Sequence, residues 1–199
     1  MELAYAERFE RRAMPREEFE QLPEQVRAEY VDGVALMSPP STGDHNGVAG
    51  EIYVVLRQAF PDAVVRYERG LALPTGTRRI PDIAVQRIRD DELWSPEVPV
   101  LVVEVLSAST RDEDLFHKPD DYRRSGITQY WIVDRTARTL TALVNAGDHW
   151  DIGLSLTDDE PTGAIQVADL GTVELDLSAL LLRSREGVEG PEVRVVEEP

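Results

Sequence analysis

Two acidic residues in apolar stretches of the chain, Asp82 and Glu104, have the type and position to do chemistry. Asp82 precedes the apolar run 83–85, and Glu104 lies within the apolar run 100–106. A buried carboxylate without a partner normally protonates, pairs with a cation or binds a metal, because burying its charge is costly. Two carboxylates on neighbouring strands repel each other unless a divalent cation lies between them. With Lys118 they form the minimum set for metal-assisted hydrolysis, and oxygen ligands favour Mg²⁺ or Mn²⁺.

Each of these residues also has a structural interpretation. Asp82 follows a proline, and aspartate in that position is common in turns. Glu104 could form a structural ion pair with an arginine such as Arg78 or Arg79 instead of binding a metal. Lys118 on its own is typical of a solvated helical lysine. The presence of both acids together favours the metal-binding interpretation.

Three further polar residues accompany this set. His45 precedes an amphipathic segment and could act as a general base, contact a phosphate, or make a local hydrogen bond near a helix start. Asp114 lies four residues before Lys118, so an ion pair on one helix face explains it adequately. Tyr122 is predicted to be a core residue whose hydroxyl needs a partner.

Length and composition limit the class of protein. A chain of 199 residues can build one sizeable core, so we expect a single domain over residues 1–182 and a polar tail over residues 183–199. The absence of cysteine excludes disulfides, zinc–thiolate sites and cysteine nucleophiles. No secretory leader or membrane-spanning apolar stretch is apparent, so we expect a cytoplasmic protein that does not enter a membrane.

The charge of the chain is unevenly distributed. A net charge of −17 argues against binding a polyanion, because nucleic-acid binding usually requires a basic surface. Residues 57–89 nevertheless carry seven arginines and three acids, a net charge of +4, whereas residues 148–176 carry eight acids and no lysine or arginine. The basic part surrounds Asp82, and it is either a solvated edge or a surface that tracks phosphates.

The pattern along the chain predicts helices and strands that would position the acids. Pro15 can open a short helix, Asp32-Gly33 suits the turn of a hairpin, and Pro119 either kinks a helical stretch or starts a helix. The predicted elements are a hairpin at 29–38, helices at 48–59 and 107–126, and strands at 63–68, 71–73, 79–87, 100–106, 128–134, 139–144, 149–156 and 173–177.

Several motifs in this order resemble two related groups of nucleases. Pro81-Asp82 followed by Glu104 resembles the PD-(D/E)xK nuclease superfamily. The wider set resembles, more narrowly, the Uma-type family of restriction-endonuclease-like proteins over most of residues 29–143. The residues that carry this resemblance are Glu29-Tyr30-Val31-Asp32-Gly33, Met37-Ser38-Pro39-Pro40, His45, Pro81-Asp82, Glu104-Val105-Leu106-Ser107, Asp114, Lys118, Tyr122, Gly126 and Tyr130-Trp131.

The resemblance implies a set of metal ligands. Asp82 and Glu104 would bind the metal together with the backbone carbonyl of Val105, which leaves coordination positions for water and a phosphate oxygen. Glu29, at the start of the hairpin, would be an accessory ligand or a group that orients water.

The sequence departs from the superfamily motif at one position. Leu106 stands two residues after Glu104, where the motif has lysine. The narrower family supplies the lysine from the following helix, which makes Lys118 the replacement. Its ammonium would stabilise the negative charge that develops on the phosphate.

The resulting hypothesis is a Mg²⁺-dependent (or Mn²⁺-dependent) DNA endonuclease. Its fold would be α/β with a restriction-endonuclease-like core, a central mixed sheet flanked by helices, and an N-terminal hairpin. One alternative is a decayed nuclease fold that serves as a nucleic-acid or protein interaction module, which Leu106 and the net charge favour. Another is a metal-dependent hydrolase of small phosphoesters. A homodimer would suit an enzyme that reaches both strands of a duplex, but the sequence determines neither this nor the target.

Overall fold

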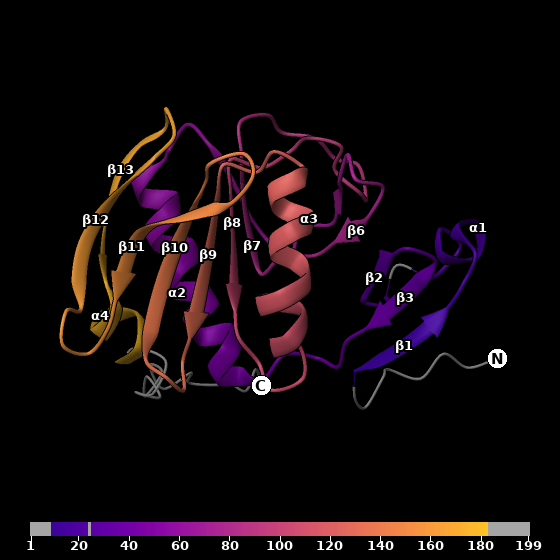
Figure 1. Ribbon diagram of the computed structural model, residues 1–199, viewed down its shortest axis with the longest axis horizontal. Coiled ribbons are helices and arrows are strands. Elements are labelled where there is room, and N and C mark those ends of the chain that lie inside the picture. The colour runs from indigo at the N-terminus through magenta and orange to yellow at the C-terminus, as the bar shows by residue number, and fades with distance from the viewer. Residues whose placement is uncertain (1–8, 24, 183–199) are drawn as a thin grey trace, which may run out of the picture.

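The computed structural model describes residues 9–23 and 25–182, which form three sheets and several helices (Figure 1). The predicted tail at 183–199 lies outside the described residues. The architecture is mixed α/β with a central mixed sheet, which confirms the predicted fold class. No helix among the described residues is long and apolar enough to cross a membrane.

The central sheet has six strands in the order β11-β10-β9-β8-β7-β4. The pair β8·β9 is parallel and the other neighbours are antiparallel, so the sheet is mixed. A parallel pair needs a long crossover, and here the crossover contains the helical segment after Glu104. The strands are β4 (Val64–Tyr67), β7 (Ile83–Gln86), β8 (Leu101–Val105), β9 (Gln129–Asp134), β10 (Thr139–Asn145) and β11 (Trp150–Leu156).

One face of the central sheet is covered by α2 (Gly43–Ala59). Thr42 caps this helix because its hydroxyl accepts a hydrogen bond from the His45 backbone N–H. The predicted apolar stripe is confirmed, and its buried members include Ile52 and Leu56. The same core includes a two-stranded sheet of β12 (Thr162–Val167) and β13 (Gly171–Asp176), followed by α4 (Leu177–Leu182).

The opposite face of the sheet carries the crossover between β8 and β9. A π-helical turn, η1 (Glu113–His117), leads directly into α3 (Lys118–Arg124). Pro119 lies in the first turn of α3, where its missing N–H leaves no helical hydrogen bond unmade. Residues alternate along β8, so Val103 and Val105 pack in the core beside α2, whereas Val102 packs with Tyr122 of α3. Glu104 therefore faces α3.

A second sheet, in the order β1-β3-β2-β6-β5, contains the N-terminal hairpin. The turn between β2 and β3 places Asp32 and Gly33 at φ values of 46° and 82°, which confirms the predicted tight turn. Pro15 precedes the short helix α1 (Arg16–Phe19), as predicted. The strands are β1 (Glu10–Ala13), β2 (Ala28–Val31), β3 (Val34–Met37), β5 (Leu71–Ala72) and β6 (Arg78–Arg79).

The predicted strand at 79–87 is wrong as a single element. It divides into β6 and β7, which belong to different sheets, and Asp82 lies just before β7. Two contacts explain the break. The Ile80 N–H bonds to the side chain of Glu29 instead of a neighbouring strand, and Pro81 has no N–H to donate.

The acidic C-terminal part also differs from the prediction. The strand expected at 173–177 ends at Asp176, and the helix α4 begins at the next residue. The strand at 162–167 was not predicted, because its residues include exposed polar positions and two small ones. Both strands pair only with each other, which gives the fold a short separate sheet.

Candidate functional site

The four predicted site side chains line one cavity. We call this cavity, of about 420 Å³, the acidic cleft. Glu29, Asp82, Glu104 and Lys118 all contribute to its wall and are all buried. They come from β2, from the segment before β7, from β8 and from the start of α3. The fold therefore brings together residues that are up to 89 positions apart in the sequence.

Asp82 is held at the junction of β8 and α2. Its Oδ2 accepts a hydrogen bond from the backbone N–H of Val105 at 2.7 Å and lies 3.1 Å from Nε2 of His45. Arg27 is more distant, with its guanidinium 3.9 Å from Oδ1. Burial opposes protonation of His45, but the hydrogen bond and the charge of Asp82 outweigh it and raise the pKa of the imidazole.

Glu104 is held from the other side by α3. Its Oε1 accepts hydrogen bonds from Nζ of Lys118 at 2.7 Å and from the hydroxyl of Tyr122 at 2.8 Å. Burial raises the pKa of Glu104 well above its ordinary value, and the nearby charges of Asp114 and Asp82 raise it further against the opposing effect of Lys118. Burial in the cleft therefore disfavours the charged form of Glu104.

Lys118 is shared between three carboxylates. Its Nζ lies 2.7 Å from Glu104, 2.8 Å from Asp114 and 3.5 Å from Glu29. Burial alone would lower the pKa of Lys118, but these charges outweigh it and raise the pKa well above the ordinary value. One buried ammonium thus faces three acids, and the cleft carries excess negative charge.

Glu29 connects the cleft to a second buried cation. Its Oε2 accepts a hydrogen bond from Arg79 at 2.9 Å, and its Oε1 accepts one from the Ile80 N–H at 2.8 Å. Burial by itself would raise the pKa of Glu29, but Lys118 and Arg79 outweigh it and lower the pKa to about 2. Arg79 is fully buried and also pairs with Glu113 and Asp121.

The donor set of the cleft fits a hard divalent cation. The hydrogen-bond partners of Asp82 bind its Oδ2, and those of Glu104 bind its Oε1. In the described part of the chain, Oδ1 of Asp82 and Oε2 of Glu104 therefore accept no hydrogen bond. Among the described residues, no three His, Cys, Asp or Glu side chains converge as ligands. A cation held by two carboxylates and a backbone carbonyl would keep several waters, as Mg²⁺ usually does.

Two of the structural alternatives raised by the sequence analysis, an arginine pair with Glu104 and a solvated Lys118, are wrong. Neither Arg78 nor Arg79 pairs with Asp82 or Glu104, since Arg78 lies near Glu20 and Arg79 near three other acids. Lys118 is buried rather than solvated. Leu106, which occupies the position of the motif lysine, is buried and does not line the cleft.

Sequence reasoning gave too small a role to three residues. The predicted helix-face pair of Asp114 with Lys118 and the core position of Tyr122 are both confirmed, but the sequence did not predict that both residues contact the buried ion cluster of the cleft. Positions 114, 118 and 122 recur every four residues, which is the spacing of one helix face and could have identified them together. His45 contacts Asp82 because the capped N-terminus of α2 begins beside the cleft.

This arrangement defines a class of fold. A central mixed sheet with helices on both faces, and an acid near the carboxyl end of a central strand, is the architecture of restriction-endonuclease-like proteins. The chain belongs to the Uma2 family, whose model is described as "Putative restriction endonuclease" and matches residues 16–167. This confirms the family that the motifs indicated.

A solved structure supports the assignment of the fold. It is described as "a putative nuclease belonging to DUF820 from Anabaena variabilis ATCC 29413". The similarity covers 84% of this chain and 97% of that chain, with a TM-score of 0.68 and 18% sequence identity. At this identity the similarity establishes the fold alone. No curated protein matches the chain.

Proposed function

We propose that this protein is a Mg²⁺-dependent (or Mn²⁺-dependent) endonuclease that hydrolyses phosphodiester bonds of DNA. The observation that carries the proposal is the shared cleft, in which two buried carboxylates, Asp82 and Glu104, lie with the buried ammonium of Lys118. Membership of the Uma2 family and the nuclease-like fold support it. Carboxylate oxygens suit a hard cation, and an ammonium suits a charged phosphate.

Each residue of the cleft then has a distinct role. Asp82, Glu104 and the Val105 carbonyl would hold the cation, which supplies Lewis acidity and lowers the pKa of a bound water. Lys118 is fixed by its carboxylate partners and stabilises negative charge on the phosphate. Glu29 is ionised at neutral pH, so it accepts a hydrogen bond from water and orients it.

Metal-dependent cleavage by the purified full chain tests the proposal. Supercoiled plasmid and single-stranded DNA are each incubated with the protein, with and without Mg²⁺ or Mn²⁺. We expect cleavage of at least one of these substrates, and only when the metal is present. Asp82→Asn and Glu104→Gln should each abolish cleavage, because each removes a charged ligand. Asp169→Asn, at an exposed acid paired with Arg87, is the matched control and should cut normally.

The melting temperature separates loss of chemistry from loss of folding. Glu104→Gln should melt close to the wild-type temperature without metal, because it keeps the side-chain shape and burial disfavours the charge that it removes. Circular dichroism without metal should show that Asp82→Asn is folded. Added Mg²⁺ should raise the melting temperature of the wild type and not of the variants. Cleavage retained in either variant would refute the proposal.

A second candidate function is favoured by one observation. Lys118 and Tyr122 already bind one oxygen of Glu104, and His45 and Val105 already bind one oxygen of Asp82, so each acid has partners without a cation. A nuclease fold whose metal site has decayed, acting as an interaction module, would look like this. Calorimetric titration with Mg²⁺ distinguishes the two, because a decayed site gives no saturable binding.

A further inference from the structure

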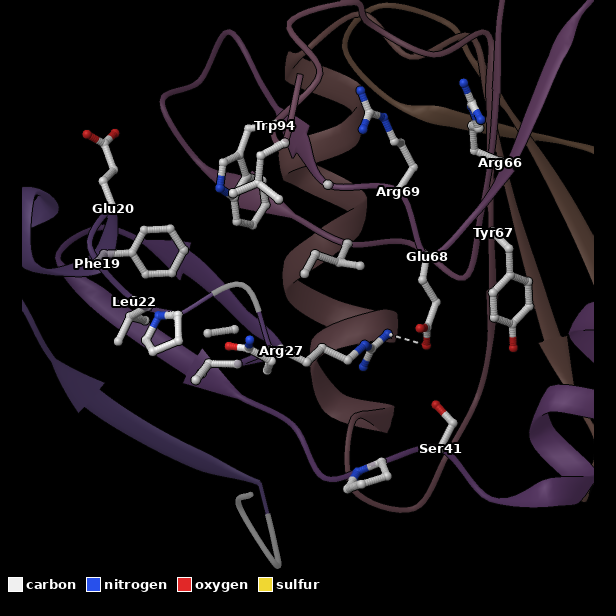
Figure 2. A pocket seen from close by; sticks show the side chains of 18 of the residues that line it. Phe19, Glu20, Leu22, Arg27, Ser41, Arg66, Tyr67, Glu68, Arg69 and Trp94 are labelled. Carbon is white, nitrogen blue, oxygen red and sulfur yellow. Dashed lines mark ion pairs between the residues drawn. The ribbon is translucent and has the colours of Figure 1, made fainter. Parts of the chain in front are cut away.

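A second cavity of about 770 Å³ adjoins the acidic cleft. Arg27, Pro40 and Ser41 line both cavities, so the two are joined along the side chain of Arg27. Figure 2 shows Arg27 crossing the floor of this cavity toward Glu68, with which it forms an ion pair at 3.4 Å. The volume lies within the range of about 300–1,000 Å³ that is usual for ligand pockets. We call it the Tyr67 cavity.

Aromatic side chains form opposite walls of the Tyr67 cavity. Phe19 and Trp94 lie together on one side, with ring centroids 5.7 Å apart, and Tyr67 lies on the other (Figure 2). Tyr67 is 37% exposed, and its hydroxyl donates to Asn46 at 2.9 Å, which fixes the ring. Burial, with the charges of Glu68 and Asp82, raises the pKa of Tyr67 to about 12, so the ring stays neutral. Such rings are platforms on which a base can stack.

Arginine donors lie between these aromatic walls. Nε of Arg27 and Nε of Arg69 are buried and have no hydrogen-bond partner among the described residues. Arg69 also pairs with Asp90 through its outer nitrogen. Arg66 lines the same cavity and makes no ion pair in the described part of the chain. Those two nitrogens are shielded from the cavity, so among its described arginines Arg66 is the one that is free to bind an acceptor atom of an occupant.

We propose that the Tyr67 cavity binds an unstacked base of single-stranded DNA, next to the phosphate that is cut in the acidic cleft. The inference rests on the proposed function and specifies its substrate. A base offers both an aromatic face for Tyr67 and acceptor atoms for Arg66. Its own phosphate would then lie on the side of Arg27, Pro40 and Ser41, where the two cavities meet.

The charge of the protein favours a single strand over a duplex. A duplex keeps its bases stacked and is held mainly through phosphates, which requires many cations. This chain has a net charge of −17, and four acids line the Tyr67 cavity beside its three arginines. Stacking does not depend on net charge, so it can replace part of the missing electrostatic attraction.

Binding of a fluorescein-labelled oligothymidylate, followed by anisotropy without divalent metal, tests the proposal. The full chain should bind it more tightly than a hairpin duplex of the same length. Tyr67→Ala should weaken this binding about tenfold or more, since it removes a stacking surface. Tyr67→Phe keeps the ring and loses only the bond to Asn46, so it should bind like the wild type. Ile152→Ala, at an exposed apolar residue of β11, controls for nonspecific surface effects.

An abasic oligonucleotide series shows whether Tyr67 contacts a base. Removing the base next to the cut bond should weaken binding to the wild type as much as Tyr67→Ala does. In the Tyr67→Ala variant the same removal should have little further effect. Equal binding of duplex and single strand, or additive effects of the two changes, would overturn the inference.

The outcomes separate this inference from the proposed function. Tyr67-dependent binding without any metal-dependent cleavage would support the cavity and refute the nuclease. Metal-dependent cleavage of a duplex that Tyr67→Ala leaves unchanged would support the nuclease and refute the cavity.

Discussion

At the scale of single residues, acidic side chains outnumber the basic ones that pair with them in the acidic cleft. Glu29, Glu104 and Asp114 share the one ammonium of Lys118, and Asp82 contacts no lysine. Burial makes each uncompensated charge more costly than it would be in water. Burial raises the pKa values of Glu104 and Asp114, and the neighbouring acids raise them further. A bound cation would neutralise part of this negative charge.

Glu29 makes the opposite contribution, and its effect on stability depends on pH. Its pKa falls from the ordinary 4.5 to about 2 on folding, which corresponds to about 3 kcal/mol. Because the folded state binds this proton less tightly, the stabilisation is complete above about pH 4.5 and is lost as the pH falls toward 2. We expect Glu29→Gln to lower the free energy of unfolding in urea by about this amount near neutral pH.

The difference between Glu29→Gln and the wild type should narrow as the pH falls below about 4.5. Glu18→Gln, at an exposed glutamate 3.6 Å from Arg12, is the control and should change stability by less than about 1 kcal/mol at any pH. A deficit in Glu29→Gln that stays constant down to low pH would show that the carboxylate is not stabilised by its cations.

At the scale of elements, the sequence predicted what depends on local pattern. The hairpin at Asp32-Gly33, the stripe of α2 and the apolar strand around Glu104 follow from turn chemistry and periodicity, and all three are confirmed. The break before β7 could not be predicted, because it depends on a bond between Ile80 and a distant glutamate. The π-helical turn was missed for a similar reason, since the backbone carbonyl of Asp114 accepts a hydrogen bond from Tyr130, which lies on a different element.

Arg79 joins three elements, and this gives a test at the same scale. The guanidinium pairs with Glu29 of β2, with Glu113 of η1 and with Asp121 of α3. Replacing Arg79 by Met would remove the buried cation that these three carboxylates share. We expect a loss of about 3–5 kcal/mol in the free energy of unfolding, measured in urea.

Arg87→Met is the matched control for Arg79→Met. Arg87 forms an exposed pair with Asp169, so its loss should cost less than about 1 kcal/mol. Similar losses of unfolding free energy in the two variants would show that the ion pairs of Arg79 do not hold β2, η1 and α3 together.

At the scale of the whole molecule, the most acidic segment of the chain lies away from the Tyr67 cavity. The segment 148–176, which carries eight acids and spans β11, β12 and β13, lies at the opposite end of the central sheet from β6 and the N-terminal sheet (Figure 1). The arginines of residues 57–89 include two that line the Tyr67 cavity, Arg66 and Arg69, and Arg78, whose guanidinium lies over the ring of Trp94. A DNA strand could therefore contact the basic part while remaining far from the strongest negative charge.

This separation predicts a weak dependence of DNA binding on salt. Each phosphate neutralised on a single strand contributes about −0.7 to the slope of log K against log salt concentration. Most arginines around the Tyr67 cavity already pair with acids, whereas Arg66 makes no ion pair among the described residues. We therefore expect a slope between about −1 and −2, measured by anisotropy with oligothymidylate, and Arg66→Gln should make it shallower by about 0.7. Arg57→Gln, in the last turn of α2, should leave the slope unchanged. A steep slope that neither variant alters would mean that the phosphates bind elsewhere on the protein. It would also contradict the argument that stacking, rather than charge, accounts for the preference for a single strand.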